Sequence, residues 1–206
     1  MSNIKFSDMQ KKWLDLPKPT FCNGKKKLFL WDFDGTLFNS PGREEGSLLY
    51  LEGTGKEWPF GGWWGRNETL MPPIVPDPPP QERLIQWTYD HYLKAKADSA
   101  AHNVLLTGRP YKNRKRVQEI LKHFDISFDE EYYRGMRGIN GSDTLQIKCG
   151  IIETRLIHNS LEEMELWEDR REHIGPFAAF MGRLKSKFKL KRVVLHDVEM
   201  QTSCEI

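Results

Sequence analysis

The chain has 206 residues, a formal net charge of +2 and 38% hydrophobic residues, which fits one globular domain with a packed core. No apolar stretch approaches the roughly 20 residues that a membrane span needs, and residues 1–16 lack the apolar segment of a secretory signal. Three widely spaced cysteines, Cys22, Cys149 and Cys204, argue against a disulfide framework and favour an intracellular location, cytoplasmic or nuclear.

The first predicted strand, residues 28–33, follows a polar lead-in over residues 1–24 and runs into the pair Asp32 and Asp34. Residues i and i+2 of a strand point to the same side, so both carboxylates can project toward one site at its carboxyl end. Two like charges held that close repel each other, which raises the pKa of one of them unless a cation lies between. The pair therefore predicts a metal ion, or one acid and one base.

Residues 39–80 differ in composition from the rest of the chain. They contain eight of the 12 prolines and seven of the 16 glycines, so regular helix is not expected there. The same segment contains Trp58, Phe60, Trp63 and Trp64. Long loops in compact domains are commonly functional or disordered, and the tryptophans favour an ordered, functional one.

The remaining chain alternates between helical and strand patterns. Helices are predicted over residues 81–96, 111–124, 144–159 and 176–188, and strands over 103–107, 126–128, 163–167 and 191–198. This alternation indicates βαβ units in an α/β fold with a mostly parallel sheet. We expect residues 1–206 to form a single domain.

Several polar residues follow the predicted strands. In an open α/β sheet, ligands bind at the carboxyl ends of the strands. In chain order these ends carry Asp32, Asp34, Thr107, Glu168 and Asp169, and Lys148 lies near the start of a helix. A phosphoryl group needs a nucleophile, a counter-charge and a metal to neutralise its oxygens. The set therefore suits phosphate chemistry.

These residues resemble the four motifs of the haloacid dehalogenase (HAD) superfamily of phosphatases. The DxDGT motif is matched by residues 32–36, the second motif by Thr107, the third by Lys148 and the acidic fourth by residues 168–169. All four occur in order. The resemblance implies a Rossmann-like α/β fold with flanking helices, in which residues 39–80 form a short cap-like insertion after the first strand.

The resemblance also implies catalytic roles. Asp32 would be the nucleophile that forms an aspartyl-phosphate, and Asp34 the general acid and then the base for water. Thr107 would bind a phosphate oxygen, and Lys148 would hold the phosphate and the nucleophile. The alternatives are purely structural roles: a surface turn for the Asp pair, an ordinary strand residue for Thr107 and a helix-surface lysine for Lys148.

Mg²⁺ is the cofactor that the resemblance implies. Its ligands would be Asp32, the backbone carbonyl of Asp34 and the pair Glu168–Asp169, because Mg²⁺ prefers hard oxygen ligands. Which of the two pair members touches the metal stays open. The alternative for this pair is the ordinary preference of acidic residues for a helix N-terminus.

Residues next to the motifs are candidates for substrate binding. Gly108 and Arg109 follow the second motif, Arg170 follows the fourth, and His173 lies three residues further. Arginine suits bidentate contact with phosphate. Either arginine could instead pair with a structural carboxylate, and His173 could cap the helix.

A basic cluster, made of Arg109, Lys112, Arg114, Lys115 and Arg116, lies near a predicted helix N-terminus. Cations there oppose the helix dipole, which hints at a nearby polyanion, although a solvated face is the alternative.

A narrower resemblance rests on the runs 105–109 and 167–170, together with Lys148, His173 and Phe177, and on Trp63 and Trp64 followed by Leu70, Pro72 and Pro73. These residues are similar to the HAD domain of Swiss Army Knife RNA-repair proteins. The resemblance implies removal of a terminal phosphate from RNA or another polynucleotide, alongside RNA-repair partner enzymes. Trp63 and Trp64 would stack on bases or pack the insertion. The alternatives are a phosphatase of a small nucleotide or sugar phosphate, and a non-catalytic binding module.

Overall fold

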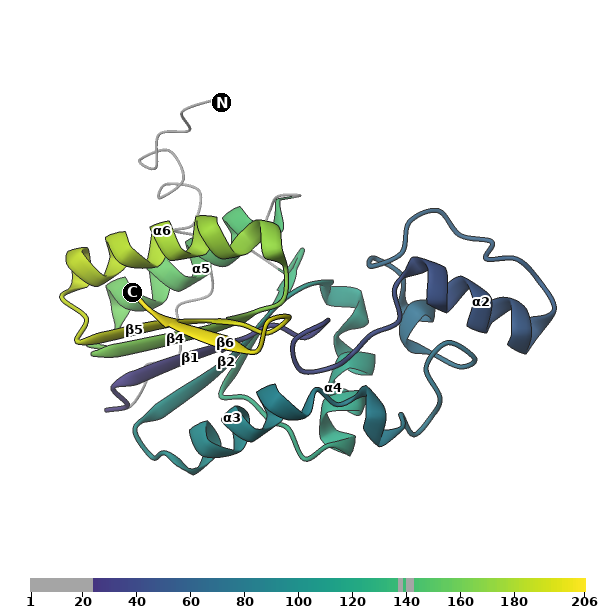
Figure 1. Ribbon diagram of the computed structural model, residues 1–206, viewed down its shortest axis with the longest axis horizontal. Helices are drawn as coiled ribbons and strands as arrows, with labels where there is room; N and C mark the ends of the chain where they lie inside the picture. The colour runs from purple at the N-terminus through teal and green to yellow at the C-terminus, as the bar shows by residue number, and fades with distance from the viewer. Residues whose placement is uncertain (1–23, 137–138, 140–142) are drawn as a thin grey trace.

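The computed structural model describes residues 24–136, 139 and 143–206, and it is built around a six-stranded sheet (Figure 1). In chain order the strands are β1 (Lys27–Trp31), β2 (Ala101–Pro110), β3 (Glu130–Arg134), β4 (Glu163–Glu168), β5 (Arg192–Asp197) and β6 (Thr202–Glu205). Their order in the sheet is β3-β2-β1-β4-β5-β6. Strands β1 to β5 are parallel, and β6 runs antiparallel to β5. The predicted mostly parallel sheet is therefore confirmed.

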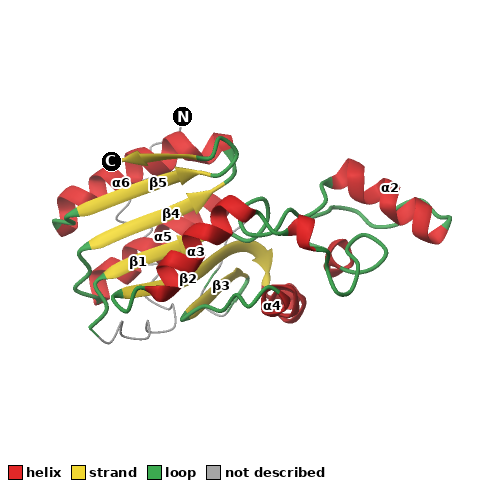
Figure 2. Cartoon of the chain, turned by 60° about the horizontal axis from the view of Figure 1, so that its bottom comes forward, coloured by secondary structure: helices red, strands yellow, loops and turns green. Residues whose placement is uncertain are grey.

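Helices cover both faces of the sheet (Figures 1 and 2). They are α3 (Gln86–Ala97) and α4 (Arg114–His123) on one face, and α5 (Thr144–His158) and α6 (Arg171–Phe188) on the other. Successive residues of β1 point to opposite faces, so Leu28 and Leu30 pack in the core with α5 and α6. Phe29 and Trp31 pack in the core with α3 and α4. The two-sided core confirms the Rossmann-like α/β fold.

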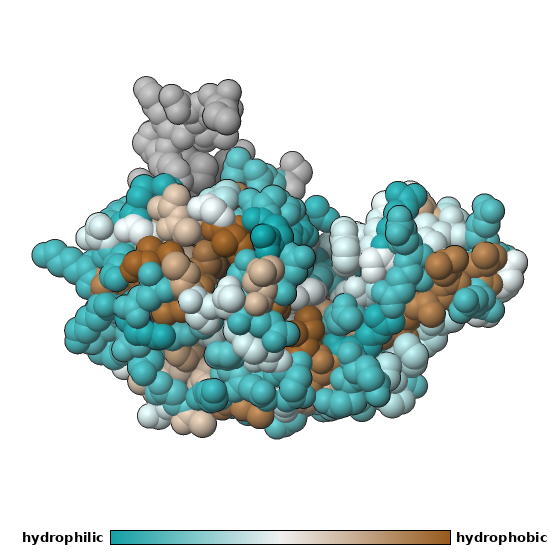
Figure 3. Space-filling model, in the orientation of Figure 1, coloured by the Kyte–Doolittle hydropathy of each residue, from teal (hydrophilic) through white to brown (hydrophobic). Residues whose placement is uncertain are grey.

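The segment of residues 39–80 extends away from the sheet and contains α2 (Arg43–Thr54) (Figure 2). The prediction that this segment lacks regular helix is therefore wrong for residues 43–54. The prolines of the segment all lie outside this helix and so do not interrupt it, and Gly55, with a φ of 69°, ends it. Hydrophobic surface lies over α2 (Figure 3), where Leu48 is 60% exposed. That the segment acts as a cap stays a prediction.

Some boundaries differ from the predicted ones. The predicted strand over residues 126–128 is wrong, because Ile126 is buried outside any strand and β3 begins only at Glu130. Helix α6 begins at Arg171, so Pro176 lies inside the helix and does not start it. Strand β6 is absent from the prediction because its four residues are all exposed and show no apolar alternation.

No helix within residues 24–136 and 143–206 is long and apolar enough to cross a membrane. Cys149 is buried, Cys204 is exposed, and both are free thiols. Burial raises the pKa of the Cys149 thiol to about 12, which leaves it protonated and unreactive. Cys22 and the predicted lead-in up to residue 23 lie outside the described residues.

Candidate active site

Asp32, Lys148 and Glu168 form a buried charged cluster at the carboxyl edge of the sheet. Trp31 is the register partner of Trp167 on β4, so the residues that follow them, Asp32 and Glu168, lie side by side. Lys148 reaches them from α5, and its Nζ lies 2.6 Å from Asp32 Oδ2 and 2.6 Å from Glu168 Oε2. The parallel sheet thus brings together residues that are 116 and 20 positions from Lys148 in the chain.

Asp169 adds a third carboxylate to this cluster. One oxygen from each of Asp32, Glu168 and Asp169 can be chosen so that all three lie within 4.8 Å of one another. Lys148 is the cation that contacts two of these acids, and one positive charge does not balance three negative ones. Carboxylate oxygens gathered this closely, with excess negative charge, fit a hard divalent cation.

The pKa values within the cluster diverge. Burial raises the pKa of Asp32, and the charge of Lys148 opposes this shift. Burial also acts on Glu168, but Lys148 and a hydrogen bond with His173 outweigh it and hold its pKa at about 2. Burial, reinforced by the charges of Asp32 and Glu168, raises the pKa of Asp169 to about 7. Burial and mutual repulsion thus raise the pKa values of Asp32 and Asp169, while that of Glu168 stays low.

Gly35 and Thr36 of the DxDGT motif fit closely around Asp169. Gly35 has a φ of 67°, and a Cβ at this position would lie 2.2 Å from Asp169 Oδ2. A side chain is therefore excluded both by the left-handed backbone and by the carboxylate. Thr36 Oγ1 lies 3.5 Å from Asp169 Oδ1. The motif thus brings the turn after β1 against the acidic residue that follows β4.

Asp34 has a different set of partners from Asp32. Arg109 donates to it from two nitrogens, with Nε 2.8 Å from Oδ2 and Nη2 2.7 Å from Oδ1. The hydroxyl of Ser40 donates to Oδ1 over 2.6 Å. The metal-compatible group found among the described residues contains the side chain of Asp32 but not that of Asp34. Ligation through the Asp34 carbonyl stays a prediction.

Arg109 lies inside the protein rather than at its surface. The residue is 1% exposed, and its Nη1 donates to Thr69 Oγ1 over 2.7 Å and to the carbonyl of Trp64 over 3.2 Å. All three of its nitrogens therefore already donate to protein oxygens. The predicted contact of Arg109 with substrate is replaced by contacts within the protein, as in the alternative of a structural ion pair.

Thr107 and Gly108 lie at the end of β2, next to the site. Thr107 is 3% exposed, and its Oγ1 accepts a hydrogen bond from the backbone N–H of Arg109 over 3.1 Å. A Cβ at Gly108 would lie 2.9 Å from Cγ2 of Thr144, the first residue of α5. Glycine thus lets the second motif approach the helix that carries Lys148. The phosphate-binding role of both residues stays a prediction.

His173 and Arg170 lie at the start of α6. His173 Nδ1 is 3.2 Å from Glu168 Oε1, so this side chain contacts the cluster and holds the carboxylate that Lys148 also contacts. Arg170 is the half-buried residue that precedes the first turn of α6. The structure thus joins His173 to the site through Glu168, whereas substrate contact by Arg170 stays a prediction.

The two adjacent tryptophans of the insertion have different environments. Trp63 is 5% exposed and donates its indole N–H to the carbonyl of Pro41 over 2.9 Å. Its ring also fills the space beside Gly46. Predicted stacking of Trp63 on a base is therefore contradicted by its burial, and packing is its role. Trp64 is 42% exposed, with its ring centroid 5.3 Å from the Arg109 guanidinium carbon.

The basic cluster divides between the interior and the surface. Arg116 is 4% exposed, and its Nε donates to the carbonyl of Leu70 over 2.8 Å. Its Nη1 lies 3.2 Å from Asp77 Oδ1. Arg109 and Arg116 therefore anchor the insertion, a role that the sequence prediction missed. Lys112, Arg114 and Lys115 are exposed.

Ser40 and Thr69 are polar residues of the insertion that the sequence analysis did not single out. Both are buried, and they contact Asp34 and Arg109 respectively. A hydroxyl in a loop of this composition has no distinguishing spacing, so no sequence signal could have found them.

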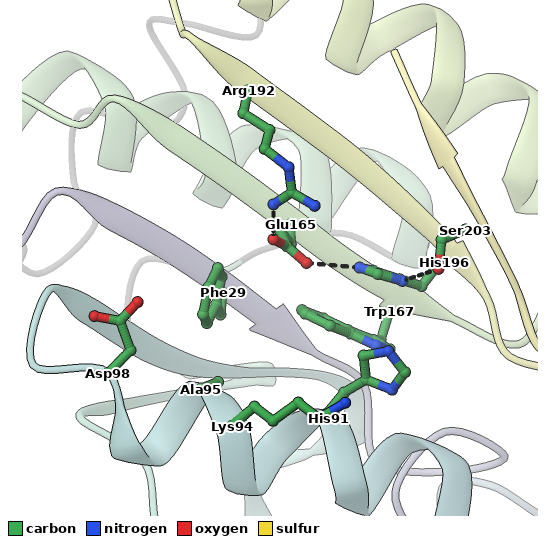
Figure 4. A pocket seen from close by; sticks show the side chains of 10 residues that line it. All are labelled: Phe29, His91, Lys94, Ala95, Asp98, Glu165, Trp167, Arg192, His196 and Ser203. Carbon is green, nitrogen blue, oxygen red and sulfur yellow. Dashed lines mark hydrogen bonds and ion pairs between the residues drawn. The ribbon is translucent and has the colours of Figure 1, made fainter.

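A cavity of about 350 Å³ lies apart from the acidic cluster, between α3 and strands β4 to β6 (Figure 4). A chain of contacts joins its lining residues Arg192, Glu165, His196 and Ser203. Glu165 accepts from Arg192, and its Oε2 lies 2.7 Å from His196 Nε2. His196 Nδ1 lies 2.7 Å from Ser203 Oγ. None of the cluster residues lines this cavity, so we assign it no part in phosphate chemistry.

A family model for HAD domain family 1 in Swiss Army Knife RNA repair proteins matches residues 50–205. The chain belongs to this family. The match contains Thr107, Lys148, Glu168 and Asp169 but begins after Asp32 and Asp34. Asp32 enters the site through the register of β1 with β4, which places it against Lys148. The family supports a phosphatase-type role in RNA repair.

An uncharacterized protein of Saccharomyces cerevisiae, YMR265C, is 28% identical to this chain over 174 residues. The match covers 77% of this chain but 37% of the yeast protein, so the chain spans well under two thirds of this relative. A chain in the structure of the Pnkp1/Rnl/Hen1 RNA repair complex is 14% identical, with a TM-score of 0.48. That similarity covers 89% of this chain and 46% of the other.

Proposed function

We propose that this domain is a Mg²⁺-dependent phosphohydrolase that acts through an aspartyl-phosphate and removes a terminal phosphate from RNA or another polynucleotide. The observation that carries the proposal is the buried cluster in which Lys148 contacts Asp32 and Glu168 beside Asp169. A nucleophile, a cation and a set of metal-compatible carboxylates meet there at the carboxyl edge of the sheet. This is the combination that phosphoryl transfer requires.

In the first step, a carboxylate oxygen of Asp32 attacks phosphorus, and the bond from phosphorus to the leaving oxygen breaks. Asp34, which must be protonated for this step, donates its proton to that oxygen. In the second step, water attacks the aspartyl-phosphate, Asp34 takes a proton from it, and Asp32 is released with inorganic phosphate. Two carboxylates with separate partners suit two separate roles, one as nucleophile and one as proton carrier.

The surrounding residues hold the nucleophile in place. Asp32 Oδ1 accepts the backbone N–H of Phe33 over 2.7 Å, while Oδ2 contacts Lys148. The carboxylate therefore has one fixed orientation, with Lys148 as counter-charge for the incoming phosphate. Thr107 would contact a phosphate oxygen beside it. Asp32, Glu168 and Asp169 would hold Mg²⁺, which when bound neutralises phosphoryl oxygens.

A polynucleotide end is favoured by the family and by the exposed surface near the second motif. Trp64 is 42% exposed and Tyr111 is 45% exposed, and the guanidinium of Arg114 lies over the Tyr111 ring at 5.9 Å. Exposed aromatic rings stack on bases, and arginine binds phosphates. Enzymes that prepare or join the same RNA ends inside the cell would be the partners.

The test is a panel of 5′-, 3′- and 2′-phosphorylated oligonucleotides, mononucleotides and sugar phosphates, assayed with Mg²⁺. We expect phosphate release from at least one oligonucleotide end, with a rate that falls steeply as salt is raised. A faster rate on a mononucleotide or sugar phosphate would replace the polynucleotide substrate by the small-molecule alternative. Complete inactivity across the panel would support a non-catalytic binding module instead.

A further inference from the structure

Arg109 connects two parts of the molecule that are far apart in the sequence. On one side, its Nε and Nη2 donate to the carboxylate of Asp34. On the other, its Nη1 donates to Thr69 Oγ1 over 2.7 Å and to the carbonyl of Arg66 over 3.4 Å. Asp34 follows β1, whereas Thr69 lies in the short 3-10 helix η1 (Asn67–Leu70) of the insertion. One guanidinium therefore bridges the insertion and the site.

The bridge is buried and fixed at both ends. The side chain of Arg109 is fully buried, and Thr69 is 0% exposed. The Thr69 hydroxyl accepts from Arg109 and itself donates to the carbonyl of Arg66 over 2.8 Å. Ser40, at the other end of the insertion, donates to the same Asp34 carboxylate. Both side-chain donors to Asp34 therefore come from, or are held by, the segment of residues 39–80.

We propose that Arg109 is a positioning residue through which the insertion sets the orientation of Asp34. The proposal rests on the proposed phosphatase function, in which Asp34 gives its proton to the leaving oxygen. A planar guanidinium that is bidentate to a carboxylate fixes both its position and its plane. Thr69 holds the far nitrogen of that guanidinium, so a change at Thr69 is transmitted to Asp34 without any contact with substrate.

The experiment compares two substrates that differ in how much they need a proton at the leaving oxygen. p-Nitrophenyl phosphate has a stable leaving anion and needs little acid catalysis, whereas ethyl phosphate needs a proton. For Thr69→Val, which keeps size but removes the hydroxyl, we expect kcat on ethyl phosphate to fall about 10- to 100-fold. We expect a much smaller loss on p-nitrophenyl phosphate and an unchanged KM on both. Arg109→Lys should give the same pattern more strongly.

The matched control is Thr54→Val. Thr54 lies at the exposed end of α2 in the same insertion, where its hydroxyl donates to the carbonyl of Tyr50. Its replacement should leave kcat on both substrates unchanged. Equal losses on both substrates with a raised KM in Arg109→Lys would make Arg109 a phosphate ligand and overturn the proposal. Wild-type rates in Thr69→Val would also overturn it.

Amide hydrogen exchange separates this proposal from the proposed function. Arg109→Lys should speed exchange in residues 64–71, whether or not the protein is a phosphatase, because the carbonyls of Trp64 and Arg66 and the hydroxyl of Thr69 lose the guanidinium that donates to them. Unchanged exchange in residues 64–71 would show that Arg109 does not hold the insertion, and would overturn the proposal even in an active enzyme. A wild-type protein that hydrolyses neither these two esters nor any phosphorylated oligonucleotide, mononucleotide or sugar phosphate would instead refute the phosphatase function, and with it the effect on Asp34.

Discussion

Asp32 and Asp34 lie two residues apart, yet they belong to regions that differ in net charge. Asp32 joins Glu168 and Asp169 around one lysine, so its region has excess negative charge and is compatible with a metal. Asp34 is paired with Arg109 and hydrogen-bonded to Ser40, so its charge is matched by the protein. Two acids of one motif are thus distinguished by which cation each meets, Lys148 from α5 or Arg109 from β2.

The difference suggests a division of labour. The region around Asp32 has excess negative charge and needs a cation from outside the protein, so its properties should depend on bound metal. The region around Asp34 is charge-balanced by Arg109, and its contacts with Ser40 and Thr69 connect Asp34 to residues 39–80. Variants of the two regions should therefore respond differently to metal, pH and substrate.

The largest effect is expected for Asp32→Asn. An amide is a poor nucleophile at phosphorus, so kcat should fall by at least about 10³-fold, with the circular dichroism spectrum and melting temperature near those of wild type. Activity would be measured by phosphate release after mass spectrometry has excluded deamidation. Wild-type turnover by the intact amide would remove Asp32 as the nucleophile.

Lys148→Met should reveal how much the acidic region depends on its single lysine. Removing one partner of a buried ion pair costs about 3–5 kcal/mol, because the remaining charges are left uncompensated. We expect a lower midpoint in urea unfolding, and partial restoration by Mg²⁺. Arg109→Met supplies the comparison, because its loss of stability should not respond to Mg²⁺. Equal responses to the ion would abolish the distinction between the two regions.

The pH dependence of Mg²⁺ binding follows from Asp169. Its pKa is raised from 3.8 to about 7, so in the absence of metal its ionisation destabilises the fold as pH rises from about 4 toward 7. A metal ligand must be ionised, so the gain in melting temperature on adding Mg²⁺ should be larger at pH 8 than at pH 6. A Mg²⁺ concentration 100-fold above Kd adds about 2.7 kcal/mol. In Asp169→Asn the gain should be smaller and nearly independent of pH; an unchanged gain would exclude Asp169 as a ligand.

Within the insertion, Trp63 and Trp64 offer the smallest and most selective test. Trp64→Ala should weaken polynucleotide binding by about 1–3 kcal/mol, the contribution of one stacked base, and spare p-nitrophenyl phosphate. Trp63→Ala removes a buried ring and should instead lower the melting temperature and both activities together. KM on an oligonucleotide and on p-nitrophenyl phosphate measures the contrast. A selective loss in Trp63→Ala alone would reverse the assignment.

The sequence predicts the main strands and the residues of the acidic cluster, but it misplaces one strand and misses one helix. Strands 28–33 and 103–107 are mainly apolar, and residues 163–167 alternate between acidic and apolar side chains before ending in Leu166 and Trp167. Parallel strands bring their polar ends to one edge, so Asp32 and Glu168 could be placed together. The strand over 126–128 was misplaced because a buried apolar residue such as Ile126 looks the same in a strand as in a loop. Helix α2 was missed because composition was averaged over the whole segment, although the prolines lie outside it.

The sequence by itself determined the α/β fold, the order of the motifs and the identity of the acidic and basic groups at the carboxyl edge, because these follow from local periodicity and from the parallel sheet. Only the tertiary structure decided how the groups pair. Arg109 and Arg116 read as a surface cluster in the sequence, but they are buried and anchor the insertion. Their partners in the insertion include the carbonyls of residues 64, 66 and 70, the hydroxyl of Thr69 and the carboxylate of Asp77, all some 40 residues away. Such contacts leave no spacing or composition that a sequence could show.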